Sequence, residues 1–67
     1  MKYKLFIYYN DDKDNHIDSK EFNNPNEIED MLEDYEGYWA KVIDLETSKA
    51  FLVGVFDDTF LDEDYYE

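Results

Sequence analysis

The sequence predicts an α+β fold: a small antiparallel sheet of three to four strands packed on one amphipathic helix, in ββαββ or βαββ order. Apolar residues recur at period two on either side of a central segment in which they recur at the helical period. The chain of 67 residues also contains 7 Tyr, 5 Phe and 1 Trp, which supply apolar surface for a core. We therefore expect one domain over residues 1–56, followed by an acidic and aromatic C-terminal segment at 57–67.

The first two strands are predicted at residues 2–9 and 16–22. The earlier stretch is rich in β-branched and aromatic side chains, and alternation places four apolar residues on one face: Tyr3, Leu5, Ile7 and Tyr9. Residues 10–15 are polar turn formers, which favour a reversal of the chain. The second strand is weaker in pattern, because only Ile17 and Phe22 are clearly apolar in it.

A helix is predicted over residues 25–36. Asn24 is a favoured N-cap residue, Pro25 suits the first helical position, and Glu27 completes a capping-box pattern. Gly37 is suited to the left-handed residue that ends many helices. Between these signals one apolar stripe recurs at i, i+3, i+4 and i+7, formed by Ile28, Met31, Leu32 and Tyr35.

Two further strands are predicted at about 38–45 and 49–56, where apolar and other residues alternate again. The polar residues 46–48 between them are typical of a hairpin turn. For residues 57–67 we expect a short helix or a loose tail, with Phe60 and Leu61 packed against the core.

The charge of the chain is strongly asymmetric. Residues 1–20 hold four acids and four lysines, so residues 21–67 carry the whole net charge of −13. No lysine lies between Glu21 and Lys41, and the expected outer arc of the helix consists largely of acids: Glu29, Asp30, Glu33, Asp34 and Glu36. A field of this size and sign favours a cationic partner.

Several function classes lack the residues they need. The chain has no cysteine, no arginine, one histidine (His16) and no glycine-rich phosphate loop, so we expect neither an enzyme nor a cofactor. It also lacks a signal peptide and an apolar stretch of about 18 residues, so we expect a cytoplasmic protein that stays off membranes.

Residues 10–21 resemble the calcium loop of EF-hand proteins. Oxygen-bearing side chains fall at the spacing of that loop: Asn10, Asp12, Asp14, Asp18 and Glu21. The resemblance implies a weak calcium site at these residues. The alternative is a polar hairpin loop with solvated acids, which the β-prone stretch before the loop favours.

The leading functional hypothesis is a non-enzymatic inhibitor that imitates nucleic-acid phosphates and blocks the basic site of a nucleic-acid-binding protein or nuclease. In size and charge pattern the chain resembles the small acidic DNA-mimic inhibitors of phages and mobile elements, including anti-restriction and anti-CRISPR proteins. The predicted partner-binding residues are Glu29, Asp30, Glu33, Asp34, Glu36, Asp57, Asp58, Asp62, Glu63, Asp64, Tyr65 and Tyr66.

Such an inhibitor is expected not to bind nucleic acid itself and to be a monomer or homodimer. The alternative function is an interaction module that works through a sheet edge or apolar contacts.

Overall fold

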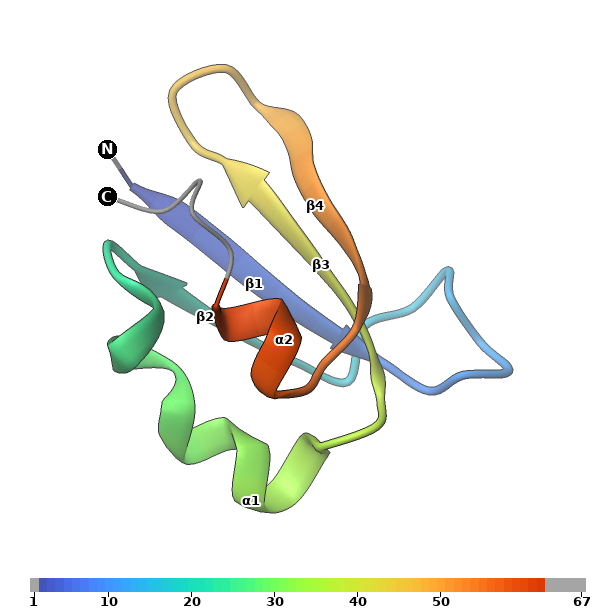
Figure 1. Cartoon of the computed structure of the whole chain (residues 1–67). Coiled ribbons are helices and arrows are strands. Elements are labelled where there is room, and N and C mark those ends of the chain that lie inside the picture. The colour runs from blue at the N-terminus through green and yellow to red at the C-terminus, as the bar shows by residue number, and fades with distance from the viewer. Residues whose placement is uncertain (1, 63–67) are drawn as a thin grey trace.

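The computed structural model describes residues 2–62, which form one antiparallel sheet and four short helical turns (Figure 1). The strands lie in the order β2-β1-β3-β4 across the sheet. Their bounds are β1 Tyr3–Tyr8, β2 Asp18–Phe22, β3 Trp39–Asp44 and β4 Lys49–Val55. The prediction of an antiparallel sheet of three to four strands is therefore confirmed with four strands, and each strand begins and ends within two residues of its predicted bounds.

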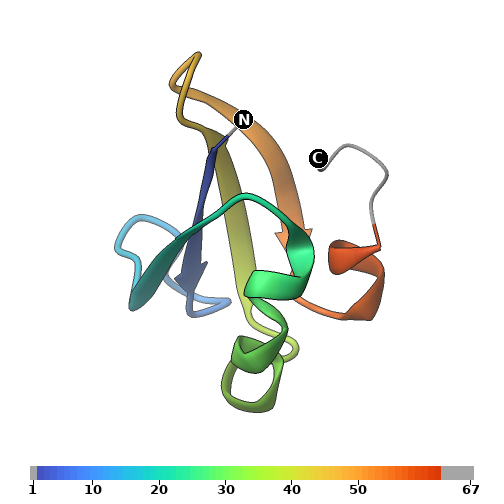
Figure 2. The same ribbon diagram turned by 90° about the vertical axis from the view of Figure 1, so that its left-hand side faces the viewer.

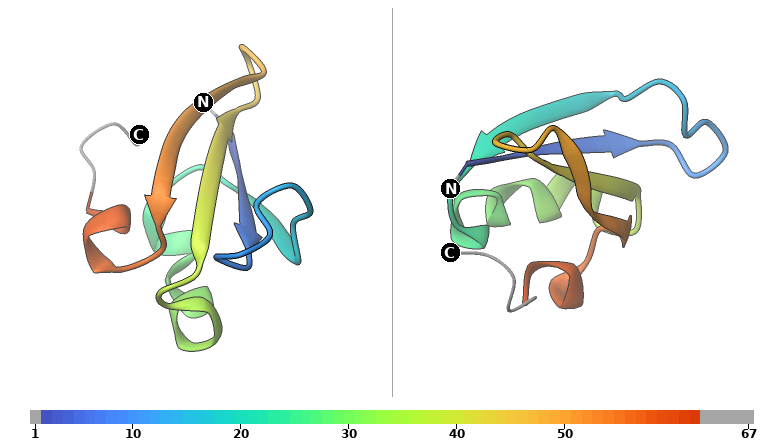
Figure 3. Two further views of the ribbon diagram at one scale, coloured as in Figure 1. Left: turned by 90° about the vertical axis from the view of Figure 1, so that its right-hand side faces the viewer. Right: turned by 90° about the horizontal axis from the view of Figure 1, so that it is seen from above.

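The helical turns lie on one side of the twisted sheet and leave its other side uncovered, as Figures 2 and 3 show. Two are single 3₁₀ turns and two are single α-helical turns. Their bounds are η1 Pro25–Glu27, η2 Glu29–Met31, α1 Leu32–Tyr35 and α2 Asp58–Leu61.

The core lies between the sheet and these turns. The register places Leu5 of β1 opposite Val42 of β3, and both are fully buried. The turns contribute Ile28, Phe60 and Leu61, all of which are buried in the same cluster. Aromatic rings fill much of the remainder through three pairs whose ring centroids are 4.9 to 5.7 Å apart: Tyr3 with Phe51, Tyr3 with Phe22, and Phe56 with Phe60.

The prediction of one continuous helix over 25–36 is wrong, because the segment divides into η1, η2 and α1. The division falls at Ile28, whose φ of −115° and ψ of 5° lie outside the α region. The segment holds like-charged pairs at i, i+4, such as Glu29 with Glu33, and no lysine that would offset them. A segment of this length is only marginally stable as a helix on its own. The course of its backbone is therefore determined by the packing of Ile28, whose side chain is fully buried.

The predicted start and end signals of this segment are nevertheless present. The Glu27 carboxylate accepts the backbone N–H of Asn24 at 2.8 Å, as a capping box requires. Gly37 has a φ of +90°, a conformation that L side chains rarely adopt. Its N–H donates to the Phe56 carbonyl at 2.8 Å, and the Phe56 N–H donates to the Tyr38 carbonyl at 2.8 Å. Gly37 thus joins the end of α1 to the residue that follows β4.

Replacing Gly37 by alanine should lower the free energy of unfolding by about 1 kcal/mol or more, because φ is positive there. Gly54→Ala is the matched control. Its φ is ordinary, and an added Cβ would meet the nearest atom, Phe60 Cδ2, at a van der Waals distance of 4.0 Å. Urea unfolding of both variants tests the assignment, and equal losses of stability would contradict it.

Candidate functional site

The two acidic segments predicted as partner-binding meet at an open groove of about 360 Å³, which we call the acidic groove. Glu29 and Leu32 form one wall, from η2 and α1. Asp58, Leu61 and Asp62 form the other wall, from α2 and the residue after it. Residues about thirty positions apart in the sequence thus place three carboxylates and two apolar side chains on one surface.

Local structure explains why the groove carboxylates are exposed. Glu29 follows Ile28, whose side chain is fully buried, and the chain turns outward between them. Asp58 opens α2, and the same turn directs Phe60 and Leu61 into the core. The acids therefore take the outer positions of turns whose apolar residues are anchored on the sheet.

Asp57 caps α2 and is held in a fixed position. Its Oδ1 accepts the Thr59 hydroxyl at 2.6 Å and the Phe60 backbone N–H at 3.0 Å. These hydrogen bonds stabilise the charged form and lower the pKa of the Asp57 carboxyl below its usual value of 3.8, and the bond from Thr59 has the largest effect. Partial burial opposes the change. Asp57 is therefore a structural cap beside the groove and not one of its lining residues.

The remaining predicted acids lie outside the acidic groove. Asp30, Glu33, Asp34 and Glu36 are exposed along η2, α1 and the turn that follows. They extend the negative surface without lining the groove. The other predicted contact residues lie outside the part of the chain that the structure describes: Glu63, Asp64, Tyr65 and Tyr66.

The residues of the calcium hypothesis are not brought together. Asp18 and Glu21 lie on β2, where the Asp18 carboxylate accepts the Tyr35 hydroxyl at 2.8 Å and Glu21 is 3.7 Å from the Lys2 ammonium. The pKa of the Tyr35 hydroxyl is raised, mainly by this hydrogen bond to Asp18 and to a lesser extent by burial. Asp12 accepts the backbone N–H of Asp14 within the preceding loop. Among residues 2–62 no group of three or more His, Asp or Glu side chains is arranged to hold a metal ion.

The lysines with aromatic contacts lie on the uncovered face of the sheet. Phe6 alternates along β1 with the buried Leu5 and Ile7, so it points to the side away from the helical turns. Lys4 and Lys41 lie over its ring at 5.3 and 5.9 Å from the centroid. Lys13 lies 3.9 Å from the ring centroid of Trp39, a β3 residue of the same face. The molecule thus separates these cations from the acids of the helical side.

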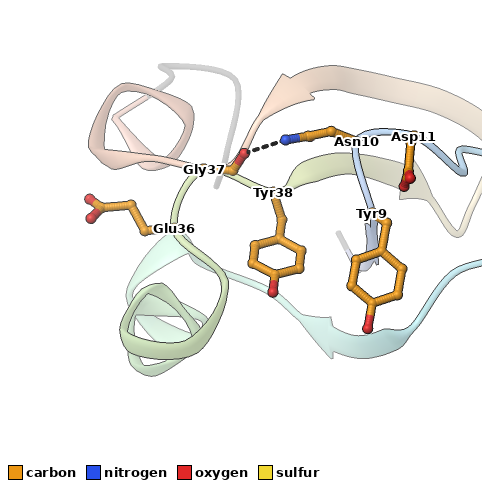
Figure 4. A pocket seen from close by; sticks show the side chains of 6 residues that line it. All are labelled: Tyr9, Asn10, Asp11, Glu36, Gly37 and Tyr38. Carbon is orange, nitrogen blue, oxygen red and sulfur yellow. Dashed lines mark hydrogen bonds between the residues drawn. The ribbon is translucent and has the colours of Figure 1, made fainter.

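A second concavity was not predicted. It measures about 300 Å³ and lies where the loop after β1 meets the turn before β3 (Figure 4). We call it the tyrosine notch; it is lined by Tyr9, Asn10, Asp11, Glu36, Gly37 and Tyr38. Sequence reasoning placed Tyr9 on a strand face but gave no sign that Tyr38, 29 positions later, would lie beside it. The only available signal was a large aromatic residue at the boundary with a polar loop.

Comparison of the chain with protein-family models, with curated proteins and with solved structures gave no match. None of the helices within residues 2–62 has the length and apolar character needed to cross a membrane.

The Asp57 cap gives a pH-dependent contribution to stability. Because the folded pKa is lowered, the contribution is present above the unfolded pKa of about 3.8 and is lost as the pH falls through the folded pKa. An asparagine at this position would cap without titrating, so wild-type stability measured relative to Asp57→Asn should fall between about pH 5 and pH 2. Urea unfolding across this range tests it.

Asp57→Ala should cost about 1 kcal/mol at pH 6, since it leaves the α2 cap empty. Asp58→Asn is the control, because Asp58 lies in the first turn of α2 while the capping hydrogen bond from the Phe60 N–H is accepted by Asp57. A wild-type stability that changes in parallel with that of Asp57→Asn at every pH would contradict the assignment.

Proposed function

We propose that this protein is a non-enzymatic inhibitor whose acidic groove and adjoining acids occupy the basic, nucleic-acid-binding site of a partner protein. The observation that carries the proposal is the meeting of Glu29 with Asp58 and Asp62 on one surface. Neither residues 23–40 nor residues 50–62 contain a lysine or arginine, so no base within these stretches neutralises the carboxylates.

The arrangement matches what such a partner site recognises. A site for duplex nucleic acid faces one negative charge per about 1.7 Å of helix axis, which demands dense and one-signed charge. The exposed acids along η2, α1 and the turn that follows provide charge of this kind on the helical side: Glu29, Asp30, Glu33, Asp34 and Glu36. Leu32, which is half-buried, adds apolar surface at the groove that becomes buried on contact. The same charge makes direct binding of nucleic acid unfavourable.

A second candidate function is that of an interaction module, in which β4 pairs with a strand of a partner or binds it through apolar contacts. We propose that such a module would act in the cytoplasm as a monomer or homodimer. β4 is an edge strand, and its Val53 and Val55 are 49% and 46% exposed. An exposed edge with apolar side chains is a recognised means of adding a partner strand. Binding of that kind depends on backbone hydrogen bonds and apolar contacts, so it survives high salt.

The deciding experiment combines affinity capture with a groove variant. The immobilised protein is used to capture nucleic-acid-binding proteins from a lysate of cells that contain its target, and the affinity of each captured protein is then measured. The triple variant Glu29→Gln, Asp58→Asn, Asp62→Asn should weaken the affinity by about 3- to 150-fold, if each exposed ion pair contributes about 0.2–1 kcal/mol. Affinity of the wild type should fall linearly with the logarithm of the salt concentration, and duplex DNA should compete.

The matched control is Asp12→Asn, Asp14→Asn, Glu46→Gln, which removes the same number of charges from the loop after β1 and the β3–β4 turn. An asparagine at position 12 retains the oxygen that accepts the Asp14 N–H. If both variants lose equal affinity, total charge matters and the groove does not. Binding that is insensitive to salt and duplex DNA but is lost in Val53→Lys would favour the β4 edge instead.

A further inference from the structure

The tyrosine notch presents two neighbouring aromatic rings with a carboxylate beside one of them. In Figure 4 the rings of Tyr9 and Tyr38 lie next to one another with their hydroxyl groups pointing the same way. Their centroids are 5.9 Å apart and their planes are inclined by 37°. The Asp11 side chain stands beside Tyr9, whereas Glu36 lies beyond Tyr38 and its carboxylate points away from both rings. Tyr9 is 51% exposed, so a ligand has access to its ring.

The walls of the notch are held by contacts on both sides. The Asn10 side-chain amide donates to the Gly37 carbonyl at 3.2 Å, which ties the loop after β1 to the turn before β3. The Tyr38 ring packs edge-on against Tyr35 at 5.5 Å, and the Tyr35 hydroxyl donates to Asp18 at 2.8 Å. A row of contacts from Asp18 through Tyr35 to Tyr38 therefore fixes one ring before a ligand arrives.

The chemistry of the lining selects a cation with an apolar or planar body. The six lining residues include two carboxylates and no lysine, arginine or histidine, and the whole chain has a net charge of −13, so an anion is repelled. Tyrosine ring faces attract cations within about 6 Å of the centroid. Among the described residues the lysines lie over Phe6, Tyr8 and Trp39 and leave Tyr9 and Tyr38 unoccupied.

We propose that the tyrosine notch is the receptor for one arginine side chain of the basic partner, with the guanidinium on the Tyr9 ring and paired with Asp11. The assignment rests on the proposed function, because that function supplies the basic partner. A volume of about 300 Å³ is at the lower limit for ligand sites and suits a single side chain. Arginine is favoured over lysine because its planar, weakly hydrated group both stacks on rings and pairs with carboxylates.

The test uses small probes and needs no partner. N-acetyl-arginine amide, N-acetyl-lysine amide and N-acetyl-citrulline amide are titrated into the full chain and followed by NMR. Citrulline keeps the planar shape of arginine but carries no charge. The arginine probe should shift the ring protons of Tyr9 and Tyr38 and show contacts to them, with weaker shifts for lysine and the weakest for citrulline.

Variants at Tyr9 distinguish the contribution of the aromatic ring to binding from that of side-chain size alone. Because Tyr9 is half exposed, Tyr9→Leu should leave the fold intact and weaken arginine binding by about 2- to 30-fold. Tyr9→Phe retains the ring face and should retain binding, whereas Asp11→Asn should weaken it. Equal shifts from citrulline and arginine, or equal binding by Tyr9→Leu and wild type, would overturn the proposal.

The groove variant distinguishes a notch that binds no arginine from a protein that lacks the proposed inhibitory function. The triple variant Glu29→Gln, Asp58→Asn, Asp62→Asn leaves the notch intact, so it should still shift at Tyr9 with the arginine probe. Arginine shifts spread over all acidic segments, without preference for Tyr9, would reject the notch even if partner capture depended on the acidic groove. Tyr9-centred shifts together with capture that ignores the groove would retain the arginine site and reject the phosphate-mimic surface.

Discussion

The burial of three apolar side chains, Ile28, Phe60 and Leu61, is the interaction on which the rest of the structure depends. They attach two acidic segments to one sheet and so hold like charges near each other. Complete burial of such a side chain contributes about 1.5–3 kcal/mol, so the three together contribute about 5–9 kcal/mol. Two exposed unit charges 4 Å apart in water repel by only about 1 kcal/mol. The apolar contacts therefore outweigh the repulsion, and the carboxylates stay where they are placed.

This balance gives the molecule two different faces. The helical side presents acids, some of them around a groove with leucine at its base, while the uncovered side of the sheet presents lysines over Phe6, Tyr8 and Trp39. A charge distribution of this kind orients a protein as it approaches a basic surface and raises the rate of association. The tyrosine notch lies at the end of the sheet where the loop after β1 meets the residues after α1, and the proposed arginine contact there would add specificity to the attraction between charges.

The sequence allowed prediction of those features that depend on local pattern. Alternation of apolar residues located β1, β3 and β4, and the polar turn formers at 10–15 indicated the return of the chain that β2 makes. Asn24, Glu27 and Gly37 marked the limits of the helical segment correctly. The break at Ile28 was not predictable from the periodicity, because it arises when tertiary burial and like-charge repulsion together prevail over a weak helical preference. The encounter of Glu29 with Asp58, and of Tyr9 with Tyr38, depends on how distant segments pack, and no local pattern records that.

The claim that packing holds repelling carboxylates at the acidic groove is tested most directly by the melting temperature of the triple variant Glu29→Gln, Asp58→Asn, Asp62→Asn. If the repulsion removed is about 1 kcal/mol, the melting temperature should rise by about 4–8 °C at low ionic strength, and the gain should shrink in about 1 M salt. The control Asp12→Asn, Asp14→Asn, Glu46→Gln should gain less. A groove variant that melts at the wild-type temperature, or gains no more than the control, would contradict the account.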